Sequence, residues 1–243
     1  MRNTSVKKYD QVFFPFMGLT FIGVALAGFW PSFVGPISQG RTDFPAAIVF
    51  HAIVMFGWLG VFVVQGLLPG AGKLQLHRRL GLASVGLFLA LMVSAVTISI
   101  GSFVSDLPPD VRVLINNLFF LQLVAWVLSP VLFVLAIRAR VNRTADHKRY
   151  MLLLTFFLIE AAASRIKWLP GMSSDEYWIV FQYLYLDIFL LALAIYDYKT
   201  LGQLAHATKV GLIIFLSYQA LTLAIWDTDV WLGAAGVLLE FFS

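Results

Sequence analysis

Long apolar stretches separated by short polar links run through almost the whole chain. A helix needs about 20 apolar residues to cross roughly 30 Å of hydrocarbon, because it rises about 1.5 Å per residue. The pattern predicts an all-helical bundle of seven transmembrane helices at residues 11–35, 45–68, 80–104, 113–137, 149–169, 177–197 and 209–226. A further apolar segment, residues 229–243, is short for a crossing, so we expect it to lie in the membrane interface or to extend the seventh helix.

The links between these stretches contain the usual interrupters of regular structure. Glycine and proline mark two of them, "LPGAGKLQLHRR" and "SDLPPD". No link is long enough to separate a second folding unit. Residues 1–243 are therefore predicted to form a single transmembrane helical domain.

Composition supports the membrane class and removes some kinds of chemistry. Hydrophobic residues make up 60% of the chain and charged residues 12%, whereas soluble domains contain roughly 25% charged residues. The chain has no cysteine, which excludes disulfides, thiolate metal sites and thiol catalysis.

Basic residues are concentrated on one side of the predicted topology. If the N-terminus is cytoplasmic, the cytoplasmic segments hold Arg2, Lys7, Lys8, Lys73, Arg78, Arg79, Arg138, Arg140, Arg143, Lys148, Arg149, Lys199 and Lys209. Only Arg41, Arg112, Arg165 and Lys167 fall on the other side. This positive-inside bias predicts a cytoplasmic N-terminus and an outer C-terminus in a bacterial cytoplasmic (inner) membrane. The net charge of +4 then reflects topology and contact with anionic lipids rather than nucleic-acid binding. Other membrane subunits are further candidate partners.

Charged and amide side chains recur at one depth within the apolar stretches. Counting about 1.5 Å per residue places Glu160 and Asp187 roughly 13 to 17 Å deep, with Gln122 near that depth and His51 and Arg165 nearer the outer face. An unpaired charge at mid-membrane costs at least about 2.5 to 3.5 kcal/mol, so these groups should face one another or water. The sequence predicts a polar pocket of these five residues, which serves either structure or the handling of a proton, an ion or a substrate.

Three predicted helices begin with similar histidine-containing sequences at the cytoplasmic side. "LHRRLGL", "DHKRYML" and "AHATKVG" place His77, His147 and His206 at these helix starts. Zinc requires three or four ligands, so a zinc, copper or iron site forms only if these helix ends meet. Binding of lipid phosphates is the alternative. Bis-histidine haem requires two histidines at matching depth, and His51 has no such partner.

Four segments carry a family resemblance: "FHAIVMFGWLGVFVVQGLL", "LQLHRRLGLASVGL", "DHKRYMLLLTFFLIEAAASRI" and "DIFLLALAIYDYKTLGQLAHAT". Together they resemble a widespread group of uncharacterised bacterial multi-pass membrane proteins, over roughly residues 50 to 210. The positions that match its pattern are His51, Gln65, His77, Arg78, Gly81, His147, Arg149, Met151, Arg165, Asp187, Tyr196, Asp197 and His206. The resemblance implies the fold and the choice of residues, but no activity.

A more distant likeness involves "HAIVMFGW" followed by "LHRRLG". These segments are similar to transmembrane b-type cytochromes, which implies a haem-ligating histidine in the second helix. The chain departs from that pattern where the fourth helix would need a histidine, because Asn116 and Asn117 stand there instead.

Two functional hypotheses follow from these residues. The first is a membrane binding or transport component, or an accessory subunit of a membrane complex, that uses the polar pocket. The second is a metal- or haem-dependent membrane oxidoreductase or hydrolase built on the histidines.

Overall fold

The computed structural model describes residues 2–174 and 176–243, without the side chains of residues 2–8 and 110. Arg2, Lys7 and Lys8, which the charge pattern counts as cytoplasmic, therefore have side chains outside the described part. The elements, in chain order, are α1 (Arg2–Phe29), a π-helical turn (Trp30–Val34), α2 (Gly35–Ser38), α3 (Ala46–Leu67), α4 (Leu74–Phe103), α5 (Pro109–Asn142), α6 (Thr144–Leu158), α7 (Glu160–Ala163), α8 (Trp178–Leu201), α9 (His206–Ile225) and α10 (Asp229–Phe242). No strand occurs in the described ranges.

Six helical segments are long and apolar enough to cross a membrane. They are Tyr9–Ser38, Ala46–Leu67, Leu74–Phe103, Val111–Asn142, Trp178–Leu201 and His206–Ile225. Their outward faces carry large exposed apolar side chains, such as Ile53, Leu82, Leu89, Leu184 and Ile213. Such faces are stable only against lipid or protein, so the prediction of an all-helical integral membrane protein is confirmed.

Among the predicted helices, the structure changes the one over residues 149–169 most. Helix α6 ends at Leu158, a turn at Ile159 follows, and α7 ends at Ala163, so the predicted end at residue 169 is wrong. A continuous helix cannot pass the sequence that follows, since Pro170 fits a helix interior poorly and Gly171 has a positive φ of 78°. From Ser164 to Tyr177 the described chain is irregular.

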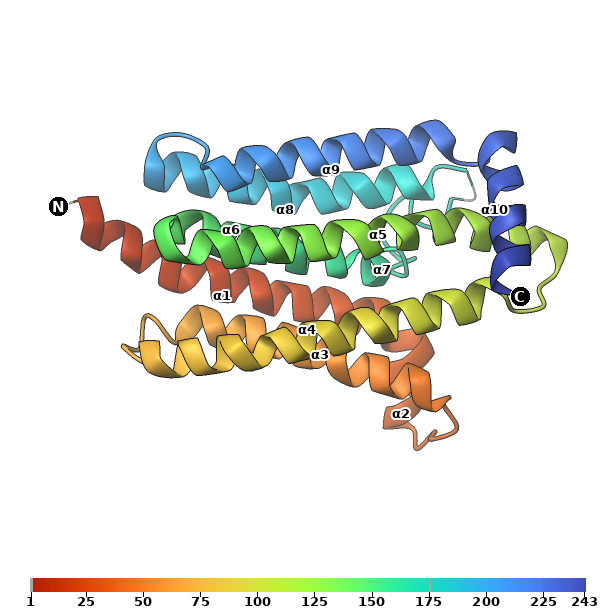
Figure 1. Cartoon of the computed structure of the whole chain (residues 1–243), viewed down its shortest axis with the longest axis horizontal. Coiled ribbons are helices and arrows are strands. Elements are labelled where there is room, and N and C mark those ends of the chain that lie inside the picture. The colour runs from red at the N-terminus through yellow and green to blue at the C-terminus, as the bar shows by residue number, and fades with distance from the viewer. Residues whose placement is uncertain (1, 175) are drawn as a thin grey trace.

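The shortened helix lies at the centre of the bundle. Every residue from Leu152 to Phe157 is buried, all around the helix. A helix without a polar face that is buried on all sides belongs in a core. Around it, Figure 1 shows α3 and α4 on one side and α8 and α9 on the other, with α1 and α5 alongside.

The connections fall into two sets at opposite ends of the bundle. The N-terminal end of α1 lies at the same end as the links 68–73, Arg143 and 202–205, at the left in Figure 1. The opposite end carries the irregular segment and α10, which runs across the ends of the longer helices. Thr228 caps α10 by accepting a hydrogen bond from the Trp231 backbone N–H at 3.4 Å. A small apolar cluster of Phe103, Phe119 and Ala235 joins α10 to α4 and α5.

Candidate functional site

Glu160 is a buried carboxyl group held by neutral hydrogen-bond donors. The Tyr218 hydroxyl lies 3.0 and 3.1 Å from its two oxygens, and the Gln182 Nε2 donates to Oε1 at 3.1 Å. These partners come from α9 and α8, while Glu160 is the first residue of α7. No cation of the described residues lies within ion-pair distance of Glu160. Burial of a charge without a counter-charge is costly, so the environment of Glu160 depends on these hydrogen bonds.

The helix interruption places Glu160 where these donors meet. Ile159 leaves the regular hydrogen-bond pattern, and its carbonyl accepts from the N–H groups of Ala162 and Ala163 at 3.0 Å each. Helix interruptions in membrane proteins require their backbone groups to be satisfied within the protein. At the interruption, an ionisable side chain therefore directly follows a backbone that departs from regular helix.

The second predicted carboxylate, Asp187 of α8, bonds to the residue of α9 next to Tyr218. Gln219 donates from Nε2 to Asp187 Oδ1 at 2.8 Å, and Gln219 directly follows Tyr218 in α9. Two successive residues of α9 thus hold Glu160 of α7 and Asp187 of α8. That the two carboxylates share one pocket stays a prediction.

Two voids adjoin the Glu160 site and differ greatly in size. The first has a volume of about 10 Å³ and is lined by Phe156, Phe157, Glu160, Tyr183, Leu186, Phe215, Tyr218 and Gln219. That volume is about the minimum for one water molecule. The second has a volume of about 190 Å³ and lies between α1, α8 and the irregular segment. Leu186 borders both voids, and Gln182 borders the larger one while bonding Glu160.

The other predicted pocket residues bond elsewhere. His51 Nδ1 lies 3.0 Å from the Ser94 hydroxyl, which pairs α3 with α4. Gln122 accepts a hydrogen bond from Ser99 at 3.2 Å, which pairs α5 with α4. Arg165 donates to the Ala161 carbonyl and lies over the Phe29 ring, 4.9 Å from its centroid. The structure therefore bonds Glu160 and Asp187 to neighbouring residues of α9 and gives His51, Gln122 and Arg165 other partners.

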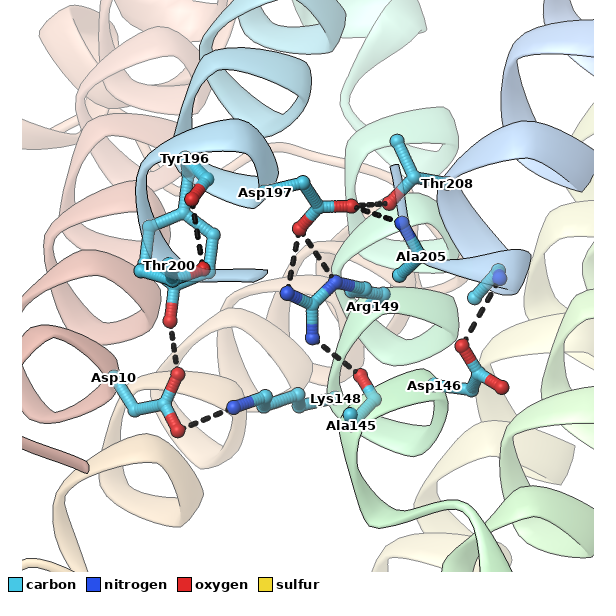
Figure 2. Close-up of polar contacts among 11 residues, drawn as sticks. Asp10, Ala145, Asp146, Lys148, Arg149, Tyr196, Asp197, Thr200, Ala205 and Thr208 are labelled. Carbon is cyan, nitrogen blue, oxygen red and sulfur yellow. Dashed lines mark hydrogen bonds and ion pairs between the residues drawn. The ribbon is translucent and has the colours of Figure 1, made fainter. Parts of the chain in front are cut away.

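A second polar cluster ties four helices together at the other end of the bundle (Figure 2). Arg149 of α6 forms an ion pair with Asp197 of α8 at 2.5 Å, and both side chains are at most 1% exposed. Asp197 also accepts from the Ala205 N–H at 2.9 Å and from the Thr208 hydroxyl at 2.6 Å. A carboxylate at the start of α9 satisfies helix donors that have no partner within the helix.

Neighbouring acidic residues extend this cluster. Asp146 accepts from the Ala207 N–H at 3.0 Å, again at the start of α9. Asp10 of α1 accepts from Tyr196 and pairs with Lys148, as Figure 2 shows. Every charge drawn there has a partner, which is the property of a structural junction rather than of an open reactive site.

The three predicted metal-binding histidines do not gather into one site. His77 Nδ1 lies 3.2 Å from the Gln65 carbonyl, and His147 Nδ1 lies 2.8 Å from the Ala136 carbonyl, whereas His206 is exposed. Within residues 2–174 and 176–243, no group of three or more His, Asp or Glu side chains is placed to hold a metal ion. Because a carbonyl oxygen only accepts, His77 and His147 donate from Nδ1.

Tyr218 is the site residue that the sequence does not reveal. The depth argument identifies ionisable and amide side chains in the membrane as candidate site residues. A tyrosine in an apolar stretch does not stand out in this way, because it also suits ordinary packing. Its position beside Gln219, in "SYQ", is the only local signal. Its partner Glu160 is 58 residues away, so the contact depends on how α7 and α9 face each other.

Fold and site together define a multi-pass integral membrane protein with an interrupted central helix and a buried carboxyl site. Comparisons of the chain with protein-family models, with curated proteins and with solved structures find no match.

Proposed function

We propose that the chain is a proton-linked binding and transport component of a bacterial cytoplasmic membrane, with Glu160 as the proton-carrying group. In this proposal α6 and α7 together make a seventh crossing beside the six long helices. The N-terminus is cytoplasmic, the C-terminus is on the outer side, and α10 lies in the outer interface. The basic residues of the links at the N-terminal end support this orientation.

One observation carries the functional part: Glu160 follows the interruption of the central helix, and its partners among the described residues are neutral hydrogen-bond donors. Transporters commonly build their sites where a membrane helix is discontinuous and irregular backbone lines a cavity. Here the irregular segment supplies Ile166, Leu169 and Met172 to the wall of the 190 Å³ void.

The sizes of the two voids separate proton handling from substrate binding. The void beside Glu160 has room for about one water molecule, which suits proton transfer between the carboxyl group and a tyrosine hydroxyl. The larger void has room for a small molecule. Gln182 connects the two, because it bonds Glu160 and lines the larger void.

We include the resemblance to the uncharacterised bacterial multi-pass family in this proposal. Arg149, Tyr196 and Asp197 match that family's pattern, and all three lie in the polar cluster of Figure 2. Their placement supports the interpretation that these positions of the family pattern form this junction between helices.

Infrared titration of the purified protein tests the proposal. A protonated carboxylic acid has its own carbonyl stretching band, so Glu160 should contribute a band that disappears on deprotonation. We expect this titrating band to be lost in Glu160→Gln and kept in the control Glu240→Gln, because Glu240 is exposed on α10. A spectrum without a titrating band, or one that Glu160→Gln leaves unchanged, contradicts the proposal.

A further inference from the structure

We infer that the 190 Å³ void between α1, α8 and the irregular segment holds an acyl chain of an anionic phospholipid, whose phosphate group binds Arg165 and Lys167. The inference deepens the proposed function, on which it rests for the orientation in the membrane, by naming the class of molecule that the void takes. It depends on the apolar wall of the void, on the contact of the void with the lipid phase, and on two cations at its outer side.

The wall of the void is almost entirely apolar. It consists of Val24, Ala163, Ile166, Leu169, Met172, Gln182, Tyr185, Leu186, Ile188 and Phe189. The Gln182 amide nitrogen is directed to Glu160, to which it donates at 3.1 Å. The Tyr185 hydroxyl donates to the Pro170 carbonyl at 3.0 Å. An engineered apolar cavity of about 150 Å³ stays dry and binds benzene, so a void with this wall favours an apolar occupant.

The void opens toward the lipid phase. Ile188 lines it and is 58% exposed on α8, within a span that is apolar enough to cross a membrane. Val24 and Tyr185 are half-buried, so the void is not sealed within the core. Along α8 its wall extends from Gln182 to Phe189, which corresponds to about 10 Å of helix axis. An acyl chain has the length and the apolar surface to fill such a space.

Two cations of the irregular segment flank Ile166, which belongs to the wall. Arg165 lies over the Phe29 ring of α1, 4.9 Å from its centroid. Lys167 lies over the Trp178 ring of α8, 4.6 Å from its centroid. The segment therefore directs one cation to each of the two helices that border the void.

These ring contacts place both cations farther out than the void. Helix α1 runs toward the outer end of the bundle, and Phe29 follows the wall residue Val24 by five residues. Helix α8 runs away from that end, and Trp178 precedes the wall residue Gln182 by four residues. At about 1.5 Å per residue, these intervals are about 6 to 8 Å. The phosphate of a phospholipid lies outward of its acyl chains in the same sense.

Aromatic side chains mark the same end of the bundle as the level of the head groups. Trp168 is 75% exposed and directly follows Lys167, and Tyr177 is 53% exposed before the start of α8. Tryptophan and tyrosine are enriched where a membrane protein passes from hydrocarbon to head groups. The two cations therefore lie where lipid phosphates lie.

Arg165 and Lys167 both retain capacity for an anion. Neither has an acidic partner within ion-pair distance in the described part of the chain. Arg165 donates to the Ala161 carbonyl, and a guanidinium has five N–H donors, so most of them remain for other acceptors. Contact with the Phe29 ring occupies the face of the guanidinium and leaves its N–H edge for a phosphate.

The count of charges selects the kind of head group. Two cations face a phosphate group that carries one negative charge, so a positive charge is left over. A head group with its own ammonium, as in phosphatidylethanolamine, would add a third cation and be repelled. We therefore assign the site to a phospholipid of net negative charge, such as phosphatidylglycerol.

Methyl NMR on the full chain in an uncharged maltoside detergent tests the inference at the void. Met172 lines the void, whereas Met17 is 3% exposed in the core and is not part of the wall. In protein labelled at the methionine methyl groups, dioleoyl phosphatidylglycerol should shift the Met172 resonance saturably and leave Met17 unchanged. Met172→Leu and Met17→Leu assign the two resonances. Absence of a saturable Met172 shift overturns the inference.

Removal of the two cations should weaken this binding. Each basic residue near an anionic head group contributes about 5-fold, so Arg165→Gln combined with Lys167→Gln should raise the Kd for phosphatidylglycerol about 10- to 30-fold. The control Arg41→Gln, which breaks an exposed pair with Asp43, should leave the Kd unchanged. Dioleoyl phosphatidylethanolamine should bind the native chain more weakly than phosphatidylglycerol. Equal affinities of the two lipids, or a Kd that the double variant does not change, overturn the assignment of the head group.

A matched pair of tryptophan variants on α8 tests the place of the acyl chain. Ile188→Trp narrows the opening of the void and should abolish the Met172 shift. Ile195 is 46% exposed, seven residues further along nearly the same face, and is not part of the wall, so Ile195→Trp should keep the shift. Because both positions are exposed, neither change disturbs the core. A shift that persists in Ile188→Trp overturns the inference.

Glycerol 3-phosphate separates the lipid from its phosphate alone. It carries the phosphate group without a chain, so it should not shift Met172 and should bind far more weakly than phosphatidylglycerol. Binding as tight as that of the lipid would replace the lipid site by a site for soluble phosphates and overturn the inference.

Failure of this inference is distinguishable from failure of the proposed function. The Met172 shift requires no titration of Glu160, and the infrared band that Glu160→Gln removes requires no lipid. An infrared band without lipid binding contradicts only the lipid site. Lipid binding without the band contradicts only the role of Glu160 in carrying a proton.

Discussion

Arg149 and Asp197 form an ion pair whose two side chains are fully buried. Each side chain is at most 1% exposed, and the pair is 48 residues apart in sequence. The remaining polar atoms of this pair bond to Ala145, Ala205 and Thr208, so the desolvated charges are compensated. Glu160 differs from Asp197 because its partners are hydrogen-bond donors without a charge.

Removal of one partner of the buried pair should destabilise the protein strongly. Arg149→Met leaves Asp197 buried without a counter-charge, for which we expect a loss of about 3 to 5 kcal/mol in the free energy of unfolding. The matched variant Arg41→Met breaks an exposed pair with Asp43 and should leave stability nearly unchanged. Denaturant unfolding in mild detergent measures both. Similar stabilities for the two variants would contradict the role assigned to the pair.

Helix α1 approaches α7 more closely than any side chain would allow. A Cβ atom on Gly28 would lie 2.1 Å from the Ala162 carbonyl oxygen, so glycine is required at this crossing. The contact holds the short helix that carries Glu160 against α1. Gly23 lies in the same helix, but a Cβ atom there would have no neighbour within 4 Å.

Alanine at these two glycines should have opposite effects. Gly28→Ala must push α1 and α7 apart and should cost about 1 to 3 kcal/mol of stability, as overpacked cores do. Gly23→Ala should be neutral or should stabilise by up to about 1 kcal/mol, because alanine favours helix more than glycine. Thermal unfolding of the two variants decides the point. Equal destabilisation would show that the crossing does not require glycine.

The whole molecule keeps its polar groups at the ends and at a few interior points. At one end the cluster of Figure 2 joins α1, α6, α8 and α9. At the other end, the irregular segment covers the larger void and α10 crosses the helix ends. The site of Glu160 lies between these regions, inside the bundle.

The absence of cysteine makes the proposed topology directly measurable. Lys73→Cys lies in the link before α4 and Asp106→Cys in the link after it, and both positions are exposed. In intact spheroplasts an impermeant maleimide should label Asp106→Cys alone, and Lys73→Cys should react only after permeabilisation. Reversed labelling would contradict the orientation, and labelling of both from one side would contradict a crossing by α4.

The apolar pattern by itself predicted the helical class and seven crossings, of which six correspond to helices long and apolar enough to span a membrane. These features follow from local chemistry, because a backbone in hydrocarbon must satisfy its own hydrogen bonds and a crossing has a minimum length. Helix depth also related Glu160 to Asp187, since depth depends only on position along each helix.

Only the tertiary structure decided which partners each polar side chain has. Tyr218 and Gln182 around Glu160, the pairing of His51 with Ser94 and the placement of Arg165 over Phe29 all depend on the rotation and spacing of helices that are distant in sequence. A repeat of 3.6 residues per turn says which residues share a face, but not which helix that face meets. The packing around α6 supplied that information, because a core buried on every side admits few arrangements that satisfy its polar atoms.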